Sequence, residues 1–194
     1  MLTPAQIKAT AASIEADQLS SGLILWFAGG HADPWNHVEA AMALTVAGRH
    51  DAAERAYDWL AATQHDDGSW CNYYLADGIE EPRRDTNVVA YAAAGVWHHY
   101  LVTGDRGFLE SMFPVVEAAL EFVLRFQQPT GEVLWAMDPD GTPGRFALLT
   151  GSSSIHLSLR CGIAVAAELG KDRPAWERAA LNLAHAIADG EHLF

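Results

Sequence analysis

One short motif recurs three times in this chain and constrains its fold more than any other feature. It reads QLSSGLILW at 18–26, QHDDGSW at 64–70 and QQPTGEVLW at 127–135. In each copy a glycine follows the glutamine by four residues, and a tryptophan follows the glutamine by six or eight. Glycine permits the positive φ of a tight helix exit, a glutamine amide can bond free carbonyls at a helix end, and tryptophan can cover the joint. The motif predicts three equivalent corners in one repeating architecture.

The segments around these corners carry helical periodicity and helix-capping residues. They span 4–17, 33–48, 50–64, 85–104, 105–127, 151–170 and 172–190. Pro114 predicts either a kink in its helix or a later start of that helix. No segment shows the alternation of a strand, so we expect an all-α protein of roughly seven helices.

The helices come in pairs whose members differ in character. The first helix of a pair is apolar nearly all round, as in VVAYAAAGVW and CGIAVAA, whereas the second carries a charged face, as in DAAERAYDW and PAWERAALN. Buried first helices and half-exposed second helices describe an α/α toroid of helical hairpins, here about half of an (α/α)6 barrel. We expect residues 1–194 to form a single domain. It is either the N-terminal part of a larger toroid or a chain that closes its ring as a homo-oligomer, since an open half-ring exposes apolar flanks.

Composition excludes several classes of partner. The chain has 12 basic and 25 acidic residues, a net charge of −13, which disfavours nucleic acid. No apolar run reaches the ~20 residues of a membrane helix, and the first residues do not resemble a signal peptide, so we expect a cytoplasmic protein without membrane contact. The adjacent His98 and His99 point to different sides of a helix, and the two cysteines are too few for a thiolate site. We expect no metal and no cofactor.

Two family resemblances add to this interpretation. The stretch from DPWNHVEAAMAL through DTNVVAYAAAGVWHHYLVTG to GSSSIHLSL resembles the six-hairpin glycosidase superfamily, in its glucoamylase-like branch, and also bacterial proteins often labelled prenyltransferase. The corner AERAYDWLAATQHDDGSW resembles the Gln–Trp repeat of terpenoid cyclase and prenyltransferase toroids. Both resemblances imply an (α/α)6 toroid whose active site lies where loops enter the N-termini of the inner helices. The first also implies a glycoside hydrolase.

The loops before the inner helices, 27–37, 71–87 and 135–156, are the longest connections in the chain. They hold aromatic faces for stacking on sugar rings and polar groups for sugar hydroxyls. The substrate-binding candidates are His31, Trp35, Asn36, Tyr73, Tyr74, Arg84, Asn87, Trp135, Ser152, Ser153 and His156. The expected ligand is a small molecule or an oligosaccharide. A plainer interpretation stays open, in which Asp33, Asp85 and one of Ser152–Ser154 only cap helices and the tryptophans only pack.

The catalytic carboxylates are harder to assign. The glucoamylase-like resemblance implies a general-acid Glu after a Leu–Trp pair in the third loop, but here VLWAMDPDG places Ala136 there. The candidates are therefore Asp138, Asp140, Asp33 and Asp85. The alternatives are a glycan-binding or assembly toroid without catalysis and, more weakly, a terpenoid or prenyl-group enzyme. The chain has neither an Asp–x–Asp–Asp nor an Asp–Asp–x–x–Asp run for the last.

Overall fold

The computed structural model describes residues 2–194. Its helices are α1 (Pro4–Asp17), α2 (Pro34–Val46), α3 (His50–Thr63), α4 (Thr86–Ala90), α5 (Ala92–Thr103), α6 (Arg106–Leu124), α7 (Leu149–Glu168) and α8 (Pro174–Asp189), followed by a 3-10 turn at Glu191–Leu193. The strands are β1 (Tyr73–Leu75), β2 (Gly78–Glu81), β3 (Arg84–Asp85) and β4 (Ala136–Met137). The prediction of a mostly helical chain of hairpins is confirmed.

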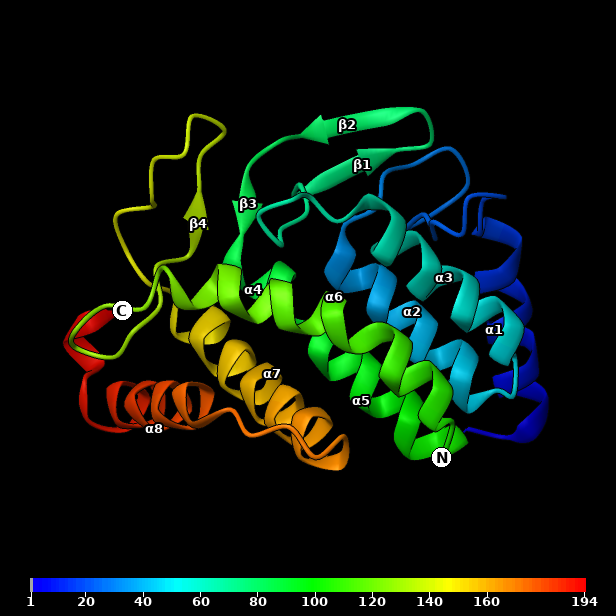
Figure 1. The fold of residues 1–194 in the computed structure, drawn as a ribbon. Coiled ribbons are helices and arrows are strands. Elements are labelled where there is room, and N and C mark those ends of the chain that lie inside the picture. The colour runs from blue at the N-terminus through cyan, green and yellow to red at the C-terminus, as the bar shows by residue number, and fades with distance from the viewer. Residues whose placement is uncertain (1) are drawn as a thin grey trace.

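The helices form the two layers that their composition predicts. The inner helices α2, α4–α5 and α7 pack side by side, and α3, α6 and α8 each pack on the inner helix that precedes them in the chain (Figure 1). Ala92, Ala93, Ala94, Gly95 and Val96 of α5 are all buried, so this helix lies in the middle of the core. Two details differ from the sequence prediction. The expected helix 85–104 is interrupted for one residue at Tyr91, and α6 runs through Pro114 instead of starting there.

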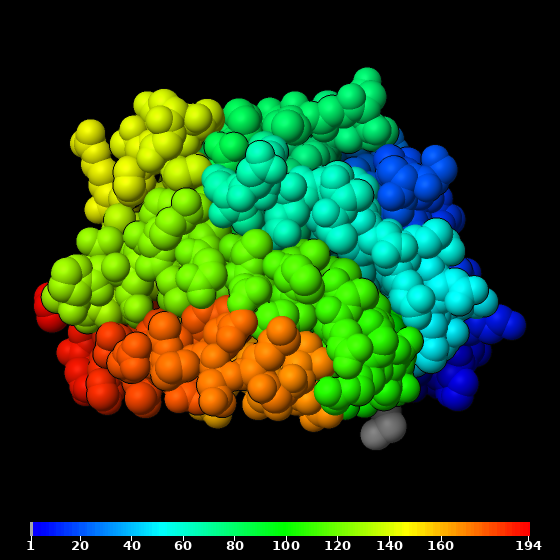
Figure 2. Space-filling model, in the orientation of Figure 1, coloured from blue at the N-terminus to red at the C-terminus, as the bar shows by residue number. Residues whose placement is uncertain are grey.

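Four strands were not predicted, because each has only two to four residues, too few to show an alternating pattern. β1 and β2 form an antiparallel hairpin, and β3 pairs with β4 in the register Arg84↔Met137 and Asp85↔Ala136. Figure 2 shows the strand segments and the loop after β4 standing together on one edge of the molecule, above the helices. None of the helices in the described part of the chain combines the length and apolarity that crossing a membrane requires.

The three corners have the same geometry, and it differs in one respect from the expected one. Each glutamine amide donates to the carbonyl of the glycine in its own corner and to a carbonyl of the next outer helix. The pairs of acceptors are Gly22 and Ala52 for Gln18 (3.0 and 2.9 Å), Gly68 and Val115 for Gln64 (2.9 and 3.0 Å), and Gly131 and Ala179 for Gln127 (both 2.9 Å). The corner therefore joins successive outer helices as well as ending one of them.

The tryptophans of the corners do not share one role. Trp70 is fully buried and donates its indole N–H to the carbonyl of Leu60 at 3.0 Å. It therefore packs over the end of its helix, as expected. Trp26 is half exposed and Trp135 is partly buried, and both belong to the loops beyond their corners. The expectation that tryptophan covers every joint is therefore wrong for Trp26.

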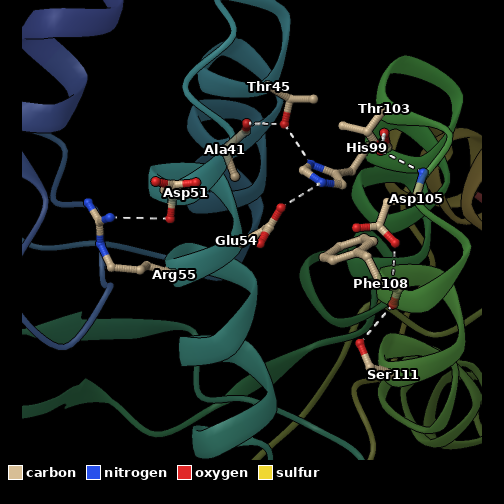
Figure 3. Close-up of polar contacts among 10 residues, drawn as sticks. All are labelled: Ala41, Thr45, Asp51, Glu54, Arg55, His99, Thr103, Asp105, Phe108 and Ser111. Atoms are coloured by element: carbon tan, nitrogen blue, oxygen red, sulfur yellow. Dashed lines mark hydrogen bonds and ion pairs between the residues drawn. The ribbon is translucent and has the colours of Figure 1, made fainter.

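Short turns close the opposite end of the molecule, and a buried histidine lies there. The Nδ1 atom of His99 on α5 is 2.9 Å from the hydroxyl of Thr45 on α2, and its Nε2 atom lies 3.7 Å from the Glu54 carboxylate on α3 (Figure 3). A second buried histidine, His37, accepts a hydrogen bond from the N–H of Ile24 at Nδ1 (3.1 Å) and donates from Nε2 to the carbonyl of Ala56 (2.9 Å). Burial lowers the pKa of both histidines to about 4.

These two histidines predict a loss of stability in mild acid. Because the folded state binds the second imidazole proton less readily than the unfolded chain, stability is complete above pH 6.5 and falls as the pH drops toward 4. Each histidine contributes a slope of up to ~1.4 kcal/mol per pH unit. Urea unfolding at several pH values measures this dependence of the free energy of unfolding on pH. Because His99→Gln removes one of the two titrating imidazoles, it should reduce the slope by the contribution of one histidine. A free energy of unfolding that stays constant between pH 7 and 5 would contradict this expectation.

Candidate active site

Three loops that are far apart in the sequence meet at the N-terminal ends of α2, α4 and α7. Ala32, which precedes the N-cap residue Asp33 of α2, exchanges backbone hydrogen bonds with Tyr74 of β1 (2.8 and 2.9 Å). The pairing of β3 with β4 joins the second loop to the third. These backbone contacts bring the three loops together on one face, at the inner-helix starts.

Asp33 and Asp85 each cap an inner helix. Asp33 accepts the backbone N–H of Asn36 at 2.9 Å, and its second oxygen accepts the Asn36 side-chain amide at 2.7 Å and the Trp26 indole N–H at 2.8 Å. Asp85 accepts the backbone N–H groups of Asn87 and Val88 at 2.8 and 3.2 Å. The capping interpretation is correct for both aspartates. It is wrong for Ser152–Ser154, because α7 begins at Leu149.

The two aspartates interact electrostatically. Burial raises the pKa of Asp85, the N–H groups of Val88 and Asn87 oppose this rise, and the charge of Asp33 adds to it. Burial also raises the pKa of Tyr73, with further increases from the charges of Asp33 and Asp85. Asp33, Asp85 and Tyr73 therefore form one group at the base of the loop face. In this group Asp33 is held by three donors, whereas Asp85 holds its proton more strongly than an ordinary aspartate does.

Aromatic side chains lie beside these carboxyl groups. The ring of His31 stacks on Tyr73, with centroids 4.9 Å apart, and Trp26 meets His31 edge-on at 4.5 Å. The Nδ1 atom of His31 is 2.9 Å from the Glu80 carboxylate on the β1–β2 hairpin. Trp26 and Glu80 were missed in the sequence. Trp26 had been interpreted as part of a corner, and Glu80 stands in a hairpin that shows no strand pattern.

Two predicted stacking residues are occupied by other contacts. The hydroxyl of Tyr74 accepts the N–H of Cys71 at 2.8 Å, and this tyrosine is buried. Trp35 stacks on Tyr91 of the next inner helix at 4.8 Å, with its indole N–H buried and without a partner. Trp35 therefore joins the start of α2 to the next inner helix, whereas Tyr74 packs edge-on against Trp59 of the outer helix α3.

The third loop carries its own cluster. Asp138 pairs with Arg83 at 2.9 Å, and the Arg83 guanidinium lies 5.2 Å from the ring centre of Trp135. Trp135 stacks on Phe146 at 5.5 Å with an angle of 13° between the rings. Asp140 is exposed at the tip of the loop, where a hydrogen bond from the Thr142 N–H lowers the pKa of its carboxyl. Arg83 and Phe146 had no distinguishing signal in the sequence.

The remaining candidates fall into two places. Asn87, Trp135 and Ser152 line a hollow of about 70 Å³ beside Asp85. Ser153 is exposed and donates to the carbonyl of Leu149 at 2.8 Å. Arg84 turns back to the second corner, where its Nε donates to the Ser69 hydroxyl at 3.2 Å.

His156 lies further along α7, in a groove against α8 lined also by Arg160 and Leu181. The structure does not bring it to the other candidates. Within residues 2–194, His, Cys, Asp and Glu side chains form no group of three placed to hold a metal ion.

The comparisons with known proteins agree with this architecture. No protein-family model matches the chain. It is 49% identical over 194 residues to the MMP endo-(1,4)-3-O-methyl-alpha-D-mannosidase of Mycolicibacterium hassiacum, a match that covers 100% of this chain and 54% of the relative. The chain spans about half the length of this relative.

Solved structures of similar fold include a D-mannose isomerase and an unsaturated glucuronyl hydrolase specific for heparin. The isomerase has a TM-score of 0.70 and 11% identity, covering 97% of this chain and 52% of its own. The hydrolase has a TM-score of 0.69 and 16% identity, covering 95% and 55% respectively. At these identities the likeness establishes the fold, an α/α toroid of helical hairpins, and no more.

Proposed function

We propose that this chain carries the acid-bearing part of a glycoside hydrolase that cleaves neutral (1→4)-linked α-mannosides, 3-O-methylated ones among them. The observation that carries the proposal is the pair Asp33 and Asp85, two interacting carboxyl groups at the starts of adjacent inner helices with unlike surroundings. Glycoside hydrolysis needs one carboxyl that keeps its proton and one that stays ionised. The mannosidase relative supports the choice of substrate.

Asp85 is the proposed general acid. It stands directly opposite Ala136 in the β3–β4 ladder, so it presents a carboxyl beside the position where the sequence resemblance placed the missing acid. Burial and the nearby charge of Asp33 favour the protonated form that an acid requires. In the reaction, Asp85 gives its proton to the glycosidic oxygen as the bond to the anomeric carbon breaks. The carboxyl group of Asp33, held by its three hydrogen-bond donors, stabilises the positive charge that develops on the sugar ring. A water molecule then adds to the anomeric carbon and returns a proton to Asp85.

The charges of the site favour a neutral sugar. Both arginines near the carboxyl groups are engaged, Arg83 with Asp138 and Arg84 with Ser69. Glu80 adds a further carboxylate on the hairpin. A uronate bound beside Asp33 and Asp85 would meet like charge from these carboxyl groups.

A panel of glycans tests the proposal, with thermal shift reporting binding and released reducing ends reporting turnover. The panel includes 3-O-methylated and unmethylated (1→4)-α-mannose oligosaccharides, a glucuronide series and an isoprenoid diphosphate. We expect stabilisation and product release with the mannosides alone. Release from the glucuronides only, or no response to any glycan, would refute the proposal.

Removing the charge of Asp33 should move the pH profile in a predictable direction. Without that charge the ionised form of Asp85 is less disfavoured, so its pKa falls and the acid form is lost at a lower pH. In Asp33→Asn, the alkaline limb of kcat/KM should therefore shift to lower pH; asparagine keeps the helix cap. Asp140→Asn removes an exposed charge from the same face and should leave the limb in place. A limb that stays unchanged in Asp33→Asn would show that Asp85 is not the titrating acid.

A second candidate function has a specific observation behind it. Ala136 replaces the expected glutamate, and Asp138 of the same loop is paired with Arg83, as in a toroid that binds glycans without cleaving them. Thermal stabilisation by mannosides without product would favour this function. The prenyl-group alternative lacks such support, because the site groups several carboxylates instead of an uncharged aromatic lining.

The flanks of the half-ring suggest how the ring closes. Apolar side chains line one groove on α1 and α2, among them Ile7, Met42 and Val46, and a second groove lies between α7 and α8 at Ile163 and Leu181. We propose that further helical hairpins pack on these two flanks in a toroid of the relative's length.

A further inference from the structure

Two groups of exposed apolar side chains stand on the loop face, one on each side of the carboxyl pair. The first lobe consists of residues 26–32 and 73–81, joined by the backbone pairing of Ala32 with Tyr74. The second lobe consists of residues 134–149, held together by the pairing of Leu134 with Ala147 and by the stack of Trp135 on Phe146.

Both lobes expose large apolar side chains, although carboxylates lie on the same face. The first lobe exposes Trp26, Phe27, Leu75 and Ile79, and the second exposes Phe146, Leu148 and Leu149. The exposed fraction of Phe27 is 59% and that of Phe146 is 52%. Half or more of the surface of each residue is therefore available to a ligand. Exposed apolar groups that cluster in this way mark binding surfaces more often than isolated ones do.

The carboxyl groups lie where the lobes meet. Asp33 directly follows the strand-like end of the first lobe at Ala32, and Asp85 pairs across the β3–β4 ladder with Ala136 of the second lobe. A chain of sugars that places one glycosidic bond at Asp85 therefore extends toward a lobe in each direction. This is the arrangement that cleavage within a chain needs, in contrast to removal of a terminal sugar.

We infer that the two lobes bind the O-methyl groups of a methylated oligosaccharide on both sides of the cleaved bond, an inference that rests on the proposed function. Aromatic rings alone suffice to stack on unmodified sugars. The lobes add the aliphatic side chains Leu75, Ile79, Leu148 and Leu149, which cannot stack and which gain most from contact with methyl groups. Methyl ethers are also uncharged and need no basic partner, which suits a face that groups several carboxylates.

Binding to the Asp85→Asn protein, measured by calorimetry, tests the inference apart from turnover. The probes are a (1→4)-α-mannose tetrasaccharide with and without 3-O-methyl groups. Each buried methyl group should tighten binding about fourfold, so one methyl on each lobe predicts a preference of roughly 16-fold. Leu148→Ser, Leu149→Ser and Ile79→Ser should each weaken binding of the methylated probe and leave the unmethylated probe nearly unchanged.

Leu101→Ser is the matched control, since Leu101 is 63% exposed near the C-terminal end of α5, away from the loop face. It should change neither affinity. Equal affinity for the two probes would overturn the inference. So would lobe variants that bind normally but change the molecular mass in light scattering, because the lobes would then be a protein interface. Selective binding of the methylated probe without hydrolysis by the unmodified protein would uphold the inference and refute the proposed function.

Discussion

Asp85→Asn is expected to lower the rate of mannoside hydrolysis by about 10²–10⁴-fold, the usual contribution of a general acid. Asparagine has the size of aspartate and is an equally good helix cap, so α4 should keep its start while the transferable proton is lost. The rate is measured by release of reducing ends, and circular dichroism checks that the fold is retained.

Asp105→Asn is the control for this substitution. Asp105 is also a helix cap, because it precedes α6 and accepts the N–H of Phe108 at 2.9 Å. It lies at the opposite end of the molecule, beside His99 (Figure 3). Its replacement should leave the rate unchanged. If Asp85→Asn were as active as Asp105→Asn, Asp85 would be only a helix cap, and the acid would have to be sought in Asp138 of the neighbouring loop.

Gly68→Ala should produce a large loss of stability, at least ~3 kcal/mol, from two effects that add. Gly68 has φ +91°, a conformation that costs an L-residue ~1–2 kcal/mol. In addition, a Cβ atom at this position would lie 2.1 Å from the carbonyl oxygen of Ala118 on α6. That atom belongs to a packed helix backbone and cannot move aside, so the second corner would separate from its outer helix. The free energy of unfolding in urea measures the loss.

Gly104→Ala separates the two effects. Gly104 also has a positive φ, +69°, but no atom lies within 4 Å of the added carbon. Its replacement should cost only ~1–2 kcal/mol. If Gly68→Ala does not fold, Gln64→Ala provides a milder test, because it removes the hydrogen bonds to Gly68 and Val115 without a collision. Equal losses in Gly68→Ala and Gly104→Ala would show that the close approach to α6 is unimportant.

The helices and the caps were predictable because their signals are local. The first helix was predicted at 4–17, where the structure has it, since a Thr cap, a Pro and a helical period all lie within a few turns. Asp33 and Asp85 were recognised as caps for the same reason. Asp138 and Asp140 were candidates of equal standing in the sequence, and nothing local showed that one pairs with Arg83 and the other holds a turn.

The sequence by itself determined the inner and outer helices, the three corners and the face where the long loops gather, because each depends on spacings of a few residues. Only the tertiary structure decided which helix each glutamine reaches, and that Asp85 faces Ala136 across a two-residue ladder. Those contacts join residues about 34 to 52 positions apart. Such contacts arise from how the hairpins pack, and the sequence around either partner carries no sign of the other.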